Sequence, residues 1–474
     1  MIFPEAMPEE VGVSSLAIHR TLDYLEQRKV ALHSLLILRH DALICEAYAR
    51  PFTKNTLHRM YSETKSYVSL AIGCMFAKGY LEPNDHIVDY FPEKLPHGGP
   101  KSELAQLTIR DMLRMTTPYS MTTYKHRPTK DWVGSFFTAR ADHAPGSYFC
   151  YDTSSSHTLC ALVEKCMGMP LLGMLRSEAL TAIGFSKESY CIKDPMGVSQ
   201  GGSGLMATSR DMLSVLDLIA KGGIWQGHQL LPREYLAEAT SFQIDTLENG
   251  GANGWDFAQG YGYQFWRLTH NAWCMFGMGG QLAICLPEQD MLIVTTADTQ
   301  PLAGGAQTIL DAFWNCLLPG VTDTSLSSDT VAYTELLHRV SDMELPRVEN
   351  LARPVVNNCV KVNLGPNAPG MTALQLDEEC LTLYYGERVC LLPYQAGNLV
   401  QSCLWNDSAI PCVIAAGWRT PDTILFRIHL LGERLGSLSL QLRLGTNHVT
   451  LNMCSHEEHP DRYFMGTASG KQEK

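Results

Sequence analysis

Hydrophobic residues recur with helical spacing in the first two thirds of the chain and in short alternating runs in the last third. Apolar positions three and four residues apart predict helices over residues 62–78, 108–115, 154–167 and 208–221. The second and fourth segments open with Thr and carry Asp three positions later, which is typical of a capping box. Runs at 34–40 and 43–48, and three more between 260 and 297, are separated by turn residues and predict antiparallel strands.

The pattern changes after a helix predicted over residues 306–317. Pro319 and Gly320 are followed by a stretch rich in Ser, Thr and Asp at 322–329, which favours a linker. Beyond it, runs at 374–376, 381–385, 424–428 and 438–444 predict antiparallel strands with one buried face. We therefore expect an α+β domain over residues 1–320 and a β-rich domain over 321–474, with a disordered tail from residue 466.

Composition narrows the classes of function. Of the 474 residues, 45% are hydrophobic and 18% charged, and the net charge of −12 is spread without a basic block, which argues against a nucleic-acid partner. The start lacks a secretory signal, and no apolar run approaches a membrane span, so the sequence predicts a cytoplasmic protein without a membrane partner. No Cys-x-x-Cys, His-Glu-x-x-His or Gly-x-Ser-x-Gly motif occurs, and we expect neither metal nor cofactor.

One short motif carries candidate chemistry. Ser62 and Lys65 stand three apart at the start of a predicted helix and so share one face. A serine hydroxyl becomes a nucleophile when a base takes its proton, and a neutral lysine one turn away can do so. Keeping a lysine neutral at pH 7 costs roughly 4 to 5 kcal/mol from its reference pKa near 10.4. The plainer alternative is a helix cap beside a solvated lysine.

Four further segments accompany this motif, and together they indicate a family. The chain resembles the serine beta-lactamase-related hydrolases, in particular their esterase and linear-amide branch, which includes nylon-oligomer hydrolases. The resemblance covers roughly residues 8 to 318 and is carried, in the family's order, by residues 60–66, 108–117, 145–153, 201–211 and 277–281. It implies an antiparallel sheet backed by the terminal helices, an all-helical region, and a site in the cleft between them.

The resemblance also implies roles for individual residues. Ser62 would be the nucleophile, Lys65 its base and Tyr151 a proton relay to the leaving group. The backbone N–H groups of Ser62 and Met278 would form the oxyanion hole. The residues that would contact substrate are Tyr61, Thr153, Gly277 and Tyr148. Tyr151 as a core aromatic, and Gly277 as a turn glycine, are alternatives at these positions.

Two departures from the family pattern bear on the substrate. In penicillin-recognising relatives a cation precedes the glycine that matches Gly277 by two positions, and here that position is Met275. Without this cation a substrate carboxylate lacks its partner, which argues against an efficient beta-lactamase or a D-amino-acid peptidase. Thr153 replaces the usual asparagine, and so removes an amide that contacts peptide-like substrates. A small ester or unactivated amide is the expected substrate.

Several alternatives stay open at this stage. If an alcohol or amine outcompetes water, the same site is an acyltransferase. Met275 and Thr153 also motivate a non-catalytic or regulatory ligand-binding protein on the same fold, while a weak beta-lactamase or D-amino-acid peptidase is disfavoured. The resemblance implies that the C-terminal domain covers one side of the cleft or mediates homodimer contacts.

Overall fold

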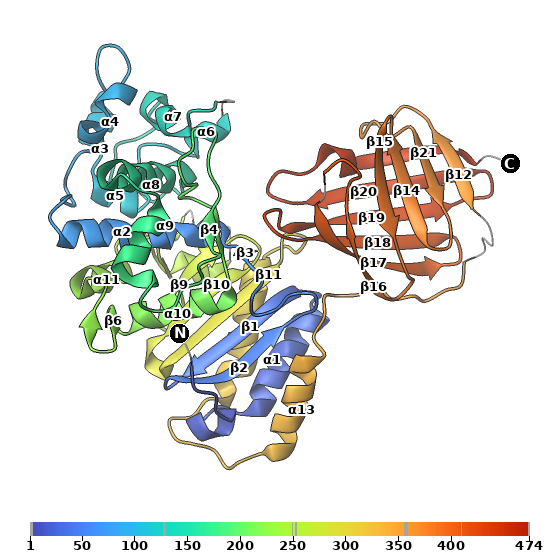
Figure 1. The fold of residues 1–474 in the computed structure, drawn as a ribbon, viewed down its shortest axis with the longest axis horizontal. Helices are drawn as coiled ribbons and strands as arrows, with labels where there is room; N and C mark the ends of the chain where they lie inside the picture. The colour runs from blue at the N-terminus through green and yellow to red at the C-terminus, as the bar shows by residue number, and fades with distance from the viewer. Residues whose placement is uncertain are drawn as a thin grey trace. The chain divides into compact units, whose positions relative to one another are not determined.

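A computed structural model describes residues 3–126, 129–248, 250–251, 254–354, 359–408 and 410–472. The chain divides into two compact units (Figure 1). The first comprises Met1–Arg28, Leu32–Ala297 and Gly304–Met343, and the second comprises Lys29–Ala31, Asp298–Ala303 and Glu344–Lys474. The predicted α+β core and appended antiparallel β unit are confirmed.

The first unit is built on a six-stranded sheet. Its strands follow the order β2-β1-β11-β10-β9-β8, with antiparallel pairing between strands that are neighbours in the chain. They span β1 (Ala31–Arg39), β2 (Ala42–Tyr48), β8 (Trp266–Arg267), β9 (Trp273–Gly277), β10 (Gln281–Leu286) and β11 (Met291–Asp298). Every residue of β1, β10 and β11 is buried, because helices cover both faces. This explains their continuous hydrophobic runs.

Two groups of helices cover the sheet. On one face, α1 (Ser15–Gln27), α12 (Gly305–Ala312) and α13 (Thr330–Ser341) pack together (Figure 1). The helical region beyond the other face contains α2 (Thr64–Ala77), α3 (Ile87–Tyr90), α4 (Ser102–Gln106), α5 (Ile109–Leu113), α6 (Thr123–His126), α7 (Trp132–Thr138), α8 (Thr153–Met167), α9 (Leu171–Leu175), α10 (Ser209–Ala220) and α11 (Arg233–Ala239). Short strands within it are β3 (His58–Arg59), β4 (Tyr190–Cys191), β5 (Leu205–Ala207), β6 (Ile224–Trp225) and β7 (His228–Gln229).

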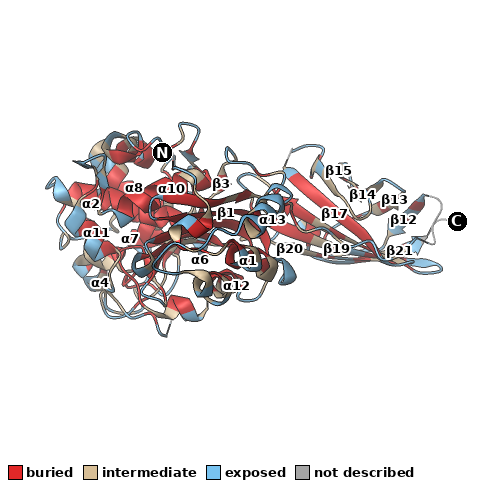
Figure 2. Ribbon diagram, turned by 90° about the horizontal axis from the view of Figure 1, so that it is seen from below, coloured by how far each residue is buried: buried red, intermediate tan, exposed pale blue. Residues whose placement is uncertain are grey.

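Helix α2 is the central element of the helical region. All its residues from Thr64 to Met75 are buried, and Figure 2 shows α2, α8 and α10 largely in the colour of buried residues. The main hydrophobic core joins these helices to the sheet through residues of β1, β9, β10 and β11. Both predicted capping boxes are present: Thr108 with Asp111 starts α5, and Thr208 with Asp211 starts α10. The start of α2 is therefore held inside a rigid, packed layer.

The second unit is one ten-stranded antiparallel sheet in the order β15-β14-β13-β12-β21-β20-β19-β18-β17-β16. Its outer strands β15 and β16 come into contact, so the sheet nearly closes into a barrel around a core of apolar side chains. The strands are β12 (Val360–Leu364), β13 (Ala373–Leu376), β14 (Cys380–Tyr385), β15 (Arg388–Pro393), β16 (Leu399–Cys403), β17 (Pro411–Thr420), β18 (Thr423–Leu430), β19 (Gly436–Leu444), β20 (His448–His456) and β21 (Gly466–Gln472).

Two features near the ends of these units differ from the local sequence pattern. The tail predicted to be disordered from residue 466 instead forms β21, because β20 and β12 supply hydrogen-bonding partners on both of its edges. Helix α13 belongs to the first unit, which extends to Met343, whereas the sequence placed a boundary after Gly320. Both arrangements depend on segments distant in the chain, which local propensity does not register.

A buried group of aromatic rings lies beside the N-terminal end of β1. His33 stacks on Phe52 with ring centroids 4.2 Å apart, and His58 lies 4.9 Å from Phe52 and 5.6 Å from His33. Both histidines are buried, and burial lowers the pKa of His58 to about 4. The fold therefore favours the neutral imidazole, and this contribution to stability is lost as pH falls from about 6.5 toward 4.

We expect the free energy of unfolding to fall by about 3 kcal/mol more in the wild type than in His58→Gln between pH 7 and pH 4, since a glutamine does not titrate. Urea unfolding at several pH values measures this difference. The exposed His228 supplies the matched control variant, His228→Gln, which should follow the wild type. Parallel pH profiles for wild type and His58→Gln would contradict the assignment.

Candidate active site

Ser62 lies in η2 (Tyr61–Glu63), a single turn that leads into α2, and its side chain is partly exposed. The preceding Tyr61 has φ +46°, in the left-handed region that aromatic residues rarely adopt, so the turn is strained. The backbone of Leu205 in β5 holds the turn from both sides. Its C=O accepts from Met60 N–H at 2.8 Å, and its N–H donates to Thr64 Oγ1 at 3.0 Å. The position of Ser62 is thus fixed by these two contacts with β5.

Lys65 lies one turn further along, where its side chain returns to Ser62. Its Nζ is 2.9 Å from Ser62 Oγ and donates to the carbonyl oxygen of Gly202 at 2.7 Å, and the side chain is 1% exposed. Gly202 approaches closely because it lacks a side chain: a Cβ there would lie 2.2 Å from Thr153 Cγ2. This contact links the segment 201–211 to the segment 145–153. Sequence reasoning quoted Gly202 within that segment but gave it no role.

Tyr151 completes the group around the serine. Its ring centroid is 4.9 Å from Lys65 Nζ, and its hydroxyl shares a hydrogen bond with Ser62. Burial raises the pKa of Tyr151, and the hydrogen bond with Ser62 partly opposes that rise. The phenol is therefore protonated at neutral pH. Its ring is held by aromatic neighbours, of which Trp266 stacks at 5.5 Å.

Asp152, which sequence reasoning passed over, follows Tyr151 directly. It is the N-cap of α8, accepting from Ser154 N–H at 2.8 Å and from Thr117 Oγ1 at 3.3 Å. Burial raises its pKa to about 6, while its hydrogen bonds and the charge of Lys65 act in the opposite direction. Near neutral pH Asp152 thus adds a buried negative charge close to Lys65. In the sequence, the capping pattern Asp152-Thr153-Ser154 was the signal that could have identified Asp152 as a buried residue near the site.

The segment 277–281 begins at the end of β9 and reaches the turn that carries Ser62. A Cβ on Gly277 would lie 2.0 Å from the carbonyl oxygen of Met60, so only glycine permits this approach. It brings the following residue, Met278, to the turn that carries Ser62. Gln281, fully buried, donates to the carbonyl oxygens of Met278 at 3.0 Å and Ala297 at 2.8 Å. These bonds fix the backbone on which the predicted oxyanion donor lies.

The predicted substrate-contacting residues differ in exposure. Tyr148 is 37% exposed and its hydroxyl lies 3.0 Å from His143 Nδ1. Thr153 is partly exposed, whereas Tyr61 and Gly277 are buried, so the Tyr61 side chain faces the interior. Met275, at the position of the family's cation, is fully buried in the hydrophobic core. The structure therefore places no positive charge at that position.

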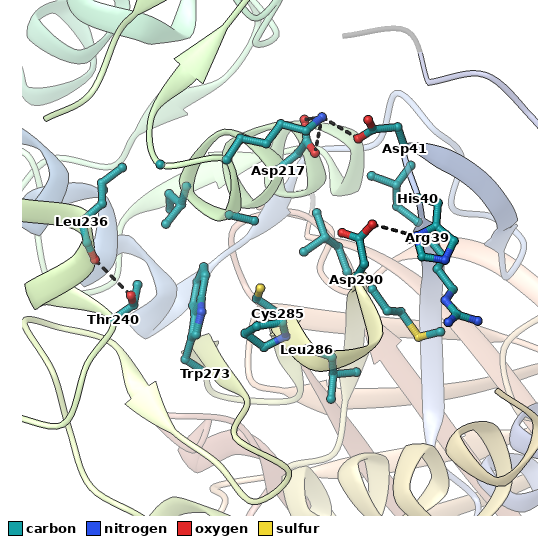
Figure 3. Close-up of a pocket in the computed structure, with 18 of the residues that line it drawn as sticks. Arg39, His40, Asp41, Asp217, Leu236, Thr240, Trp273, Cys285, Leu286 and Asp290 are labelled. Atoms are coloured by element: carbon teal, nitrogen blue, oxygen red, sulfur yellow. Dashed lines mark hydrogen bonds and ion pairs between the residues drawn. The ribbon is translucent and has the colours of Figure 1, made fainter. Parts of the chain in front are cut away.

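A separate cavity of about 500 Å³ opens at the opposite ends of the strands, where α10 and α11 meet the sheet (Figure 3). At its polar end Lys221 pairs with Asp41 at 2.6 Å and with Asp217 at 2.9 Å, and His40 pairs with Asp290 at 2.7 Å. Lys221 therefore bridges two carboxylates at this end of the cavity. None of the residues predicted for the active site lines this cavity, so we assign it no part in the chemistry.

Across the described ranges, no group of three or more His, Cys, Asp or Glu side chains is arranged to hold a metal ion. In the same residues no single helix has the length and apolar character to cross a bilayer, although the pair Thr153–Met167 and Leu171–Leu180, bent by 66°, passes that test jointly by length and composition.

Comparison with known proteins places these observations in context. A protein-family profile described as Beta-lactamase matches residues 23–312. The 6-aminohexanoate-dimer hydrolase of Paenarthrobacter ureafaciens is 22% identical over 318 residues, which is 61% of this chain and 79% of that protein.

Two solved structures share the fold. EstCE1, a hydrolase with promiscuous acyltransferase activity, matches with a TM-score of 0.51 at 16% identity, covering 63% of this chain and 98% of its own. A penicillin-binding protein homologue from Caulobacter crescentus matches with a TM-score of 0.51 at 15% identity, covering 65% and 99%. At these identities the likeness establishes the fold alone.

The contact between Gly277 and Met60 yields a prediction. Gly277→Ala should lower the free energy of unfolding by about 1–3 kcal/mol, because the new methyl group must displace the backbone before Ser62. Chemical denaturation measures this loss. Gly173→Ala on α9 is the matched control, since its Cβ would meet nothing closer than Met169 Sδ at 3.8 Å. Equal stability of the Gly277 variant and wild type would refute the proposed constraint.

Proposed function

The chain belongs to the Beta-lactamase family, and on that premise we propose that it is a serine hydrolase that cleaves small esters or linear amides through an acyl-enzyme on Ser62. The observation that carries this proposal is the 2.9 Å separation of Lys65 Nζ from Ser62 Oγ, beside the hydroxyl of Tyr151. A partly exposed serine with a buried amine in hydrogen-bond reach meets the geometric requirement for an activated nucleophile.

In the first step, Ser62 Oγ attacks the substrate carbonyl carbon while its proton passes to Lys65. This transfer requires Lys65 as the neutral amine, with its lone pair toward Oγ. The lysine is withdrawn from solvent, and burial disfavours a charged ammonium. The nearby charge of Asp152 acts in the opposite sense and favours the ammonium that forms after transfer. Burial of Lys65 and the charge of Asp152 act in opposite senses, and together they support a lysine that can take up a proton and release it again.

Tyr151 is the proposed relay to the leaving group. Because its pKa is raised, its hydroxyl is a neutral donor and acceptor in the working range, so it can donate to the departing oxygen or nitrogen and be reprotonated from Lys65. The bond between carbonyl carbon and leaving group then breaks, and the acyl group remains on Ser62. Attack of water, deprotonated through the same groups, releases the acid and restores the serine.

The oxyanion of each tetrahedral intermediate requires donors fixed in advance. We assign this role to the N–H groups of Ser62 and Met278, as the family resemblance implies. The strained turn at Tyr61 orients the first, and the hydrogen bond from Gln281 to the Met278 carbonyl holds the backbone of the second. Both contacts are in place without substrate, which lowers the reorganisation needed in the transition state.

The substrate class follows from what the site lacks and from its relatives. Buried Met275 leaves no cation at the position that would pair with a substrate carboxylate, which disfavours penicillins and D-amino-acid peptides. The relative from Paenarthrobacter ureafaciens is named for hydrolysis of a 6-aminohexanoate dimer. A linear amide or small ester is therefore the proposed substrate. Acyl transfer to an alcohol or amine uses the same intermediate, and the name of EstCE1 supports that side reaction.

Ser62→Ala should abolish the reaction with an active-site-directed fluorophosphonate and reduce ester turnover by on the order of 10⁴-fold or more, because it removes the hydroxyl that lies 2.9 Å from Lys65 Nζ. Intact mass before and after labelling measures the first effect, and an ester screen the second. Circular dichroism checks that the variant is folded. Labelling or ester hydrolysis that persists in Ser62→Ala would eliminate the assignment, and absence of labelling in both proteins would favour a ligand-binding role.

Tyr151→Phe should slow amide cleavage by about 10²–10⁴-fold while slowing cleavage of a nitrophenyl ester far less. The phenyl ring keeps the packing against Trp266, so the change removes the hydroxyl with its hydrogen bond to Ser62 and its proton relay, and a good leaving group does not need the relay. Steady-state rates with an amide and an activated ester of the same acyl group measure the contrast. An equal loss on both substrates would show that Tyr151 does not protonate the leaving group.

A further inference from the structure

Glu63, which directly follows the nucleophile, is an unexplained buried acid. Its side chain is 0% exposed, and both carboxyl oxygens lack a hydrogen-bond partner among the described residues. Buried polar groups are normally hydrogen-bonded, and an ionised carboxylate without a partner is far more costly than a neutral one. A glutamate at this place therefore calls for a physical explanation.

Among the residues that the structure describes, no cation acts to lower the pKa of Glu63. The groups that sense its charge are the Tyr67 hydroxyl on α2, which is also buried without a partner, and the Cys274 thiol on β9. Burial is the main cause that raises the pKa of each, and the charge of Glu63 adds to it. More distant acids, Asp211 for Tyr67 and Asp256 for Cys274, act in the same direction.

Lys65, two residues further along, is engaged elsewhere. Its Nζ points to Ser62 Oγ and the Gly202 carbonyl oxygen. Burial alone raises the pKa of Glu63 well above its ordinary value. Tyr67 and Cys274 are uncharged acids, and Asp211 and Asp256 carry negative charges. Apart from Lys65, the titratable groups named around Glu63 therefore favour its protonated form.

The place of Glu63 in the fold connects it to the site. The turn η2 packs directly against β9, the strand whose end carries Gly277 and Met278. A charged Glu63 could be solvated only if this turn moved away from β9, and the turn carries Ser62. Separation of η2 from β9 would also part the N–H groups of Ser62 and Met278.

We propose that Glu63 is a positioning residue in its uncharged form: a protonated carboxyl keeps the Ser62 turn seated against β9, and loss of its proton unseats the nucleophile. This inference rests on the proposed function of Ser62. It gives the reactivity of the serine two opposed dependences on pH. Reactivity rises as Lys65 becomes neutral and falls as Glu63 ionises, by about tenfold per pH unit for a one-proton loss.

The linked stability has a definite sign. The folded state holds the Glu63 proton more tightly than the unfolded chain does, so the stability it contributes is complete below the ordinary glutamate pKa of about 4.3 and is lost as pH rises toward the raised value. Glu63→Gln has nearly the same shape and no proton to lose. Its melting temperature should match that of the wild type near pH 4 and exceed it increasingly toward alkaline pH.

The experiment compares wild type, Glu63→Gln and Asp217→Asn from pH 4 to pH 10. Asp217 is the matched control, a buried acid that is paired with Lys221 and lies at the opposite end of the sheet. Two quantities are measured: the melting temperature, and the rate of Ser62 labelling by a fluorophosphonate, each rate normalised to that protein's own value at pH 6. We expect Glu63→Gln to lose the alkaline fall in labelling and the alkaline loss of melting temperature, whereas Asp217→Asn keeps the alkaline fall in labelling.

The outcomes separate the two proposals. If wild type and Glu63→Gln show coincident pH profiles of melting temperature, the Glu63 inference is overturned whatever the labelling result. If the melting profiles diverge but Glu63→Gln keeps the alkaline fall in labelling, Glu63 affects stability without positioning the serine, and the inference is likewise overturned. If no protein is labelled at any pH, the proposed function of Ser62 fails instead. Should Glu63→Gln not fold, Glu63→Met supplies a second uncharged side chain of similar length for the same measurements.

Discussion

The contact of Lys65 Nζ with Ser62 Oγ and the Gly202 carbonyl oxygen is the interaction on which the rest of the candidate site depends. Burying a lysine amine away from water costs free energy, unless its N–H groups donate hydrogen bonds to acceptors in the protein. Here one acceptor is Ser62 Oγ, in the turn before α2, and the other is the carbonyl oxygen of Gly202, in a glycine-rich loop. To bring them together, α2 must be enclosed almost completely, which requires the packed helical region around it. The contacts of Lys65 therefore depend on the packing of the first unit's core.

Close backbone approach is the second constraint. Gly202 lies against Thr153, and Gly277 against the carbonyl of Met60, at separations that any Cβ would obstruct. Each contact joins two segments that are distant in the chain, and together they assemble four motifs around one serine. The same glycines could be described as turn residues, but their surroundings give them a tighter role. Tyr61, held at positive φ between these contacts, shows that strain is concentrated beside the nucleophile.

The buried acids near the site give it an unusual electrostatic character. Asp152 caps α8 and titrates near neutral pH, whereas Glu63 has no partner and is held uncharged. The Asp152 carboxyl therefore places a negative charge close to Lys65, whereas the uncharged Glu63 carboxyl adds none to the turn that carries Ser62. This contrast arises from hydrogen bonding, because Asp152 has three donors and Glu63 has none among the described residues.

The sequence by itself determined the fold class, the main helices and strands, the two capping boxes, and the grouping of Ser62, Lys65 and Tyr151. The helices, strands and capping boxes follow from periodicity and capping residues, which are local signals, whereas the grouping of the three residues follows from the resemblance to the serine beta-lactamase-related hydrolases. Only the tertiary structure decided that Gly202 contacts Lys65, that Asp152 is a buried acid near Lys65 and Glu63 a buried acid in the turn of Ser62, that α13 joins the first unit, and that residues 466–472 form a strand. Burial and hydrogen-bond partners depend on segments far apart in the chain, and no local pattern encodes them.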